Sequence, residues 1–129
     1  MPAADARPSG PVPDGGDDGA REWPATAEAL MRSRFRAFKA GDADWLLASW
    51  HASTRPHEVD LGDNPRWRGL QVVRTDAGGV DDDTGVVEFR ATYLLAGGEL
   101  GIQHEVSRFV REDGRWFYLD EAADSPRIQ

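Results

Sequence analysis

Residues 47–59, LASWHASTRPHEV, gather an indole, two imidazoles and a guanidinium near the expected end of a helix. At the mouth of a cavity, His51 could transfer protons near neutral pH, and Arg55 could bind a carboxylate or phosphate. The same segment also suits a loop that fastens the chain, with Trp50 packed, a hydroxyl bonded to nearby backbone and Arg55 held extended by Pro56. We favour the fastening loop and keep a chemical role for His51 and Arg55 as the alternative.

Arg34 is the second candidate, because a step of about 100° per residue puts it among the apolar side chains of an expected helix. A guanidinium that points toward the core needs a carboxylate or several carbonyls, since an unpaired buried charge is strongly disfavoured. The polar residues on the expected strands that could meet it are Tyr93, Glu105, Ser107, Tyr118 and Asp120. Two interpretations stay open: a structural ion pair with Glu105 or Asp120, which we favour, and a cavity group that recognises an anion.

His104 and Glu105 suggest a metal site or an acid–base pair, yet neighbours on a strand point to opposite faces of a sheet. If Glu105 shares a face with Ser107 and Phe109, His104 lies on the other. The three histidines match no metal-binding spacing, and the aspartates at 81–83 lack the spacing of a calcium loop. The chain has no cysteine and no acyl-transfer, phosphate-loop or dinucleotide motif. We therefore predict neither a metal nor a cofactor.

The formal net charge of −8 over 129 residues opposes binding to a phosphate backbone, so nucleic acid is not an expected partner. No stretch approaches the roughly 20 apolar residues of a membrane span, and no apolar run near residue 1 suits a signal peptide. We expect a cytoplasmic protein with no membrane partner. Residues 1–22, rich in Pro, Gly, Ala and Asp, should form a disordered tail, residues 23–122 one domain and residues 123–129 a C-terminal tail.

A helical period followed by a period of two predicts an α+β fold. Thr26 and Asp42 can cap two helices, and Gly41 suits the end of the first. The later segments alternate between apolar and polar residues and are separated by glycine-containing turns. The expected bounds are 26–39 and 43–50 for the helices, and 66–75, 84–95, 100–111 and 115–121 for the strands. The apolar residues expected to face the helices are Val87, Phe89, Ala91 and Tyr93.

Four segments of the chain carry a resemblance to a known family: TAEALMRSRFRAF, WHASTRP, VEFRATY and HEVSRFVREDGRWFYLD. Together they resemble the YchJ-like bacterial proteins of unassigned function over about residues 24–121. The resemblance implies a domain like that of nuclear transport factor 2, also called SnoaL-like. This is a cone-shaped α+β fold that encloses a cavity and is shared with polyketide cyclases and ketosteroid isomerases. Many such relatives carry a cysteine-rich zinc motif, the SEC-C motif, which residues 1–129 do not contain. Dimers through the open sheet are common in this kind of fold, so a homodimer is an expected assembly.

Two functions from different classes are compatible with these residues, because a fold of this kind does not specify a reaction. The favoured hypothesis is a non-catalytic binding or accessory module whose cavity holds a small anionic or aromatic metabolite. The alternative is a cofactor-independent enzyme with His51 or Asp120 as general base and with Arg34, Arg55 or Tyr118 stabilising negative charge. An open cavity beside Arg34 would support a ligand, whereas a cavity closed by core side chains would oppose one.

Overall fold

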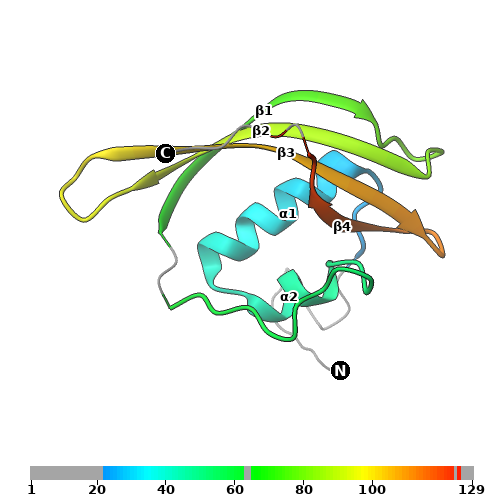
Figure 1. The fold of residues 1–129 in the computed structure, drawn as a ribbon, viewed down its shortest axis with the longest axis horizontal. Coiled ribbons are helices and arrows are strands. Elements are labelled where there is room, and N and C mark those ends of the chain that lie inside the picture. The colour runs from blue at the N-terminus through cyan, green and yellow to red at the C-terminus, as the bar shows by residue number, and fades with distance from the viewer. Residues whose placement is uncertain (1–21, 63–64, 124, 126–129) are drawn as a thin grey trace.

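The computed structural model describes residues 22–62, 65–123 and 125, and the tail expected over residues 1–22 lies almost entirely outside them. The elements are α1 (Ala27–Ala40), α2 (Ala43–Ala48), β1 (Arg66–Ala77), β2 (Thr84–Leu94), β3 (Leu100–Glu112) and β4 (Arg115–Glu121). The four strands form one antiparallel meander in the order β1-β2-β3-β4. The sheet curves over α1, and α2 lies on the side of α1 away from the sheet (Figure 1). The predicted α+β arrangement is confirmed.

Helix α1 begins and ends where its capping residues predict. The Thr26 hydroxyl accepts a hydrogen bond from the Ala29 amide at 3.1 Å, which satisfies a donor that has no partner within the helix. Gly41 follows the last turn with a φ of 74°, the left-handed conformation in which glycine has no steric penalty. Local sequence chemistry is therefore sufficient to delimit this helix.

Helix α2 is two residues shorter than the predicted range 43–50. It ends at Ala48 because the following backbone pairs with β4: the Tyr118 amide donates to the Ser49 carbonyl and the His51 amide donates to the Tyr118 carbonyl, both at 2.8 Å. Trp50 thereby forms an isolated parallel bridge to Tyr118. This long-range pairing competes with the last helical turn. The residues of the helix alone do not indicate it, because its partner lies on β4.

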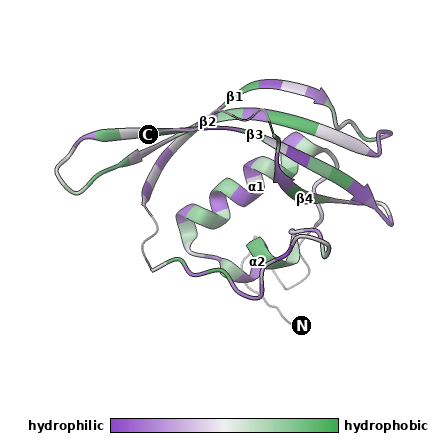
Figure 2. Cartoon of the chain, viewed as in Figure 1, coloured by the Kyte–Doolittle hydropathy of each residue, from purple (hydrophilic) through white to green (hydrophobic). Residues whose placement is uncertain are grey.

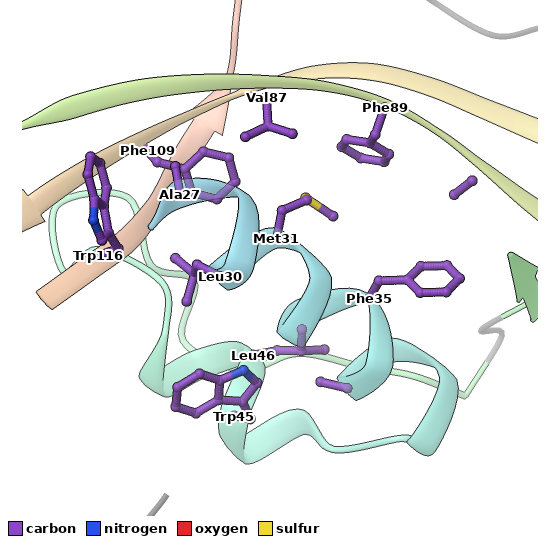
Figure 3. Close-up of a cluster of buried hydrophobic side chains, with 12 residues drawn as sticks. Ala27, Leu30, Met31, Phe35, Trp45, Leu46, Val87, Phe89, Phe109 and Trp116 are labelled. Atoms are coloured by element: carbon purple, nitrogen blue, oxygen red, sulfur yellow. The ribbon is translucent and has the colours of Figure 1, made fainter. Parts of the chain in front are cut away.

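The core lies between α1 and the concave face of the sheet. Along the strands, hydrophilic and hydrophobic residues alternate (Figure 2), and Val87, Phe89 and Ala91 of β2 are all buried as predicted. Trp116 and Phe109 lie near the N-terminal turn of α1, whereas Phe35 and Phe89 lie toward its C-terminal half (Figure 3). The two halves of the helix thus face different parts of the sheet.

Trp23 and Trp116 close the end of the core beside the start of α1. The Trp23 indole donates to the Trp116 carbonyl at 2.8 Å, and the Trp116 indole donates to the Ala25 carbonyl at 3.1 Å. Trp23 also makes an edge contact with Trp45 of α2, with 4.9 Å between ring centroids. Trp23 thus contacts both α2 and β4, elements far from it in the chain.

Candidate functional site

A cavity of about 540 Å³ opens beside the second half of α1. Its apolar wall comes from α1, β1 and β2 and includes Met31, Phe35, Phe38, Trp67 and Phe89. Residues 56, 58–61 and 65, from the connection between α2 and β1, form the opposite side. At this end of the sheet the cavity is thus bordered by the connection between α2 and β1 and not by a second helix.

Arg34 is the most deeply buried charged group of the cavity, with 3% of its surface exposed. Its Nη1 donates to the Leu46 carbonyl at 2.8 Å and to the Ser49 hydroxyl at 2.7 Å. The guanidinium also lies over the Tyr118 and Trp50 rings, at 4.6 and 5.1 Å from their centroids. Cation–π contacts and a carbonyl thus replace the carboxylate that the sequence led us to expect.

The expected structural ion pair of Arg34 is not formed with any of the described residues. Its Nε and Nη2 atoms, which carry three N–H groups, have no hydrogen-bond partner there either. Burial lowers the pKa of Arg34 to about 10, and the nearby Tyr118 and Glu105 oppose that shift. The guanidinium therefore stays charged at neutral pH and presents unused donors to the cavity.

Glu105 supplies a carboxylate on the sheet side of the cavity. Its carboxylate accepts hydrogen bonds from the Gln103 amide at 3.0 Å and from the Ser107 hydroxyl at 2.7 Å, so residues two apart on β3 hold it in place. His104 points to the other face and contacts Glu88 at 2.6 Å. The predicted separation of His104 from Glu105 is thus observed, and it rules out their action as a pair.

Tyr118 brings a phenol to the same cavity. Burial raises its pKa above the ordinary value, and the neighbouring Glu105 raises it further, so the phenol is protonated at neutral pH. Its hydroxyl makes no hydrogen bond to the part of the chain that the structure describes. Trp50 meets the Tyr118 ring edge-on at 5.2 Å, and the buried Trp50 Nε1 also has no partner among the described residues. The Tyr118 hydroxyl therefore adds a hydrogen-bond donor to those that Arg34 brings to the cavity.

Asp120 lies on the opposite face of the sheet from Tyr118, although residues two apart on a regular strand share a face. The cause is a bulge in β4: Arg108 pairs with Asp120 whereas Phe109 pairs with Tyr118, which leaves one extra residue, Leu119. The Asp120 carboxylate accepts two hydrogen bonds from Arg108, at 2.6 and 2.7 Å, and these lower its pKa. Asp120 is consequently no partner of Arg34.

The segment WHASTRP makes the contacts of a fastening loop. Arg55 donates from Nε and Nη2 to the Trp50 carbonyl at 3.0 and 2.9 Å, and the Thr54 hydroxyl donates to the Leu119 carbonyl at 2.6 Å. The His51 ring contacts the Ser53 hydroxyl at 2.7 Å and Glu112 at 3.1 Å. Neither His51 nor Arg55 lines the cavity.

Tyr93 also lies outside the cavity lining. Its ring packs against Trp67 at 5.3 Å and covers Gly101, where an added Cβ would come within 2.4 Å of the ring. Of the nine candidates, the structure brings together Arg34, Trp50, Glu105, Ser107 and Tyr118. Gln103 was missed, although its two-residue spacing from Glu105 could have indicated a shared face.

The described residues contain no group of three histidine, cysteine or acidic side chains that could hold a metal ion. None of the helices that the structure describes is long and apolar enough to cross a membrane. The groups that the cavity offers to a ligand are hydrogen-bond donors, aromatic rings and carboxylates.

The curved antiparallel sheet packed on α1 belongs to the class of domains like nuclear transport factor 2. Residues 26–121 match the family described as YchJ, middle NTF2-like domain, and the chain belongs to that family. A UPF0225 protein of Streptomyces coelicolor is 53% identical over 95 residues, which cover 74% of this chain and 73% of that protein. One from Chromobacterium violaceum is 50% identical over 97 residues, covering 73% and 71%.

A solved structure supports the same fold. The solution structure of a SEC-C motif containing protein from Rhodopseudomonas palustris superposes with a TM-score of 0.66 at 30% identity. The match covers 77% of this chain and 79% of that one. The resemblance stated from the sequence motifs is thus confirmed for the family and for the fold, and the family name assigns no activity.

Proposed function

We propose that the domain binds a small aromatic molecule through a hydrogen-bond acceptor, a carboxylate or carbonyl, directed at Arg34. The observation that carries the proposal is the buried guanidinium with unused N–H donors in a cavity lined by aromatic rings. Burial of a charge is costly unless the charge is paired, so an acceptor brought by a ligand would be bound strongly.

The size and composition of the cavity support a small-molecule ligand. A volume of about 540 Å³ falls within the roughly 300–1,000 Å³ typical of small-molecule sites, which combine apolar walls with a few polar groups. The rings of Phe35, Phe38 and Trp67 offer flat apolar surface, while Arg34 and Tyr118 offer donors. This division of the lining favours a ligand with an aromatic body and one polar end.

Binding without catalysis is supported better than an enzyme. The general bases considered for an enzyme, His51 and Asp120, are engaged elsewhere, with Ser53 and Glu112 in one case and Arg108 in the other. Of the carboxylates in the described lining, Glu105 is the one that lies on the sheet, and it already accepts bonds from Gln103 and Ser107. An acid–base role would require Glu105 to act despite these bonds.

Calorimetric titration with indole-3-propionate, an aromatic carboxylate, tests the proposal. Wild-type protein should bind it, and Arg34→Met should weaken binding by about tenfold or more, because hydrogen bonds to a charged group contribute roughly 1.5–3 kcal/mol. Arg36→Met is the matched control, since Arg36 is exposed on the same helix. The proposal fails if wild type does not bind, or if Arg34→Met binds as tightly as wild type.

A further inference from the structure

Arg34 and Glu105 are opposite charges that line one cavity without forming an ion pair with each other. They are close enough for Glu105 to oppose the lowering of the Arg34 pKa. The bonds of Arg34 go to Leu46 and Ser49, and those of Glu105 go to Gln103 and Ser107. The space beside both charges is therefore bordered by a cation and an anion, each without a charged partner among the described residues.

Both groups retain hydrogen-bonding capacity. Nε and Nη2 of Arg34 carry three unused N–H donors. The Glu105 carboxylate offers about four lone-pair positions and accepts two bonds from the described residues, one on each oxygen. A ligand that only accepts hydrogen bonds would satisfy Arg34 and leave Glu105 with no cation.

The charge around the cavity also disfavours a purely anionic ligand. The described lining contains one cation, Arg34, and three carboxylates, those of Glu58, Asp60 and Glu105. Glu58 and Asp60 are exposed, on the connection that forms the outer side of the cavity. A ligand with a positive group as well as a carboxylate would meet a complementary field there.

We propose that the ligand is a zwitterion with an aromatic body, the chemistry of an aromatic α-amino acid, whose carboxylate binds Arg34 and whose protonated amine binds Glu105. This inference rests on the proposed function, because it concerns the same cavity. Each ligand charge supplies the partner that the corresponding protein charge lacks, so the desolvation of all four groups is compensated. The aromatic group of the ligand packs against the wall formed by Phe35, Phe38 and Trp67.

Four indole probes separate the contributions when titrated against the full chain by calorimetry. Tryptophan carries both charges, indole-3-propionate only the carboxylate, tryptamine only the amine, and 3-methylindole neither. Tryptophan should bind about tenfold more tightly than either singly charged probe, because each added contact is charge-assisted. In the Glu105→Gln variant, tryptophan should bind no more tightly than indole-3-propionate. In the Arg34→Met variant, tryptophan should bind no more tightly than tryptamine.

Glu112→Gln is the matched control for the carboxylate, because Glu112 lies outside the cavity and contacts His51. It should leave the order of the four probes unchanged. N-acetyltryptophan provides a measurement that needs no variant: acylation removes the positive charge, so its affinity should fall at least to that of indole-3-propionate.

The outcomes distinguish the two proposals. If indole-3-propionate binds through Arg34 but tryptophan binds no more tightly, or if N-acetyltryptophan binds as tightly as tryptophan, the zwitterion inference is wrong while the proposed function stands. Binding of none of the four probes would overturn both. If tryptophan binds most tightly of the four probes, and if Glu105→Gln lowers its affinity to that of indole-3-propionate, both the site and its ligand class are established.

Discussion

The two ends of helix α1 pack against the same sheet in opposite ways. At the N-terminal end, Ala27 lies so close to Gly78 that a Cβ on Gly78 would come within 2.8 Å of the Ala27 Cβ. A Cβ on Gly85 would come within 2.5 Å of the Gly78 Cα. At the C-terminal end, Phe35 and Phe38 line a cavity of about 540 Å³ with Trp67. We call the N-terminal end, which also includes Trp23 and Trp116, the sealed end. We call the C-terminal end the open end.

Polar groups explain why one end closes and the other stays hollow. At the sealed end, the indole N–H groups of Trp23 and Trp116 both donate to backbone carbonyls, so close packing leaves these donors satisfied. At the open end, where Arg34 is already buried, collapse would also remove the half-buried Glu105 from water without an ion pair, which is strongly unfavourable. The comparison teaches that a cavity can be maintained by the cost of burying the charges that line it.

The largest effect should come from truncation at the sealed end. Trp116→Ala, at a side chain that is 1% exposed, should cost about 3–5 kcal/mol of unfolding free energy because it leaves a large void. Phe38→Ala, at a half-buried ring of the open end, should cost only about 1 kcal/mol because part of that ring already faces the cavity. Urea unfolding measures both. Equal losses would contradict the distinction between the ends.

A moderate effect is expected from Arg34→Leu. The change removes two hydrogen bonds and two ring contacts but leaves Glu105 bonded to Gln103 and Ser107, so the loss should be about 1–2 kcal/mol. A broken buried ion pair would instead cost roughly 3–5 kcal/mol. Arg32→Leu, which removes an exposed pair with Glu28, is the control and should cost less than about 0.5 kcal/mol. A loss from Arg34→Leu as large as that from Trp116→Ala would restore the ion-pair interpretation.

The smallest effect concerns the outer face of the sheet, where the Glu88 carboxylate has the arginine partner that Glu105 lacks. Hydrogen bonds from His104 and Arg74 lower the pKa of Glu88 below its ordinary 4.5. Because the folded-state pKa is the lower one, the stabilisation is present above pH 4.5 and is lost as the pH falls through the folded-state value. Glu88→Gln should therefore flatten the decline of the melting temperature below pH 4.5. An unchanged acid decline would show that this network adds no stability.

Element bounds could be predicted well because their signals are local. Thr26 and Gly41 delimit α1 through their own backbone and side-chain chemistry, and glycine-containing turns separate the strands. The inward direction of Arg34 also followed from helical geometry alone. The end of α2 and the direction of Asp120 could not be predicted, since the first depends on pairing with β4 and the second on the bulge at Leu119.

The amino-acid sequence by itself determined the α+β class, the family and the presence of a charged residue on the buried face of α1. Periodicity, capping and turn preferences act over a few residues, so they can be recognised without coordinates. Only the tertiary structure decided that the core is open at one end and that Glu105, not Asp120, shares the cavity with Arg34. Those outcomes depend on contacts between segments far apart in the chain and on strand register. One extra residue in β4 is enough to turn the Asp120 side chain to the other face of the sheet.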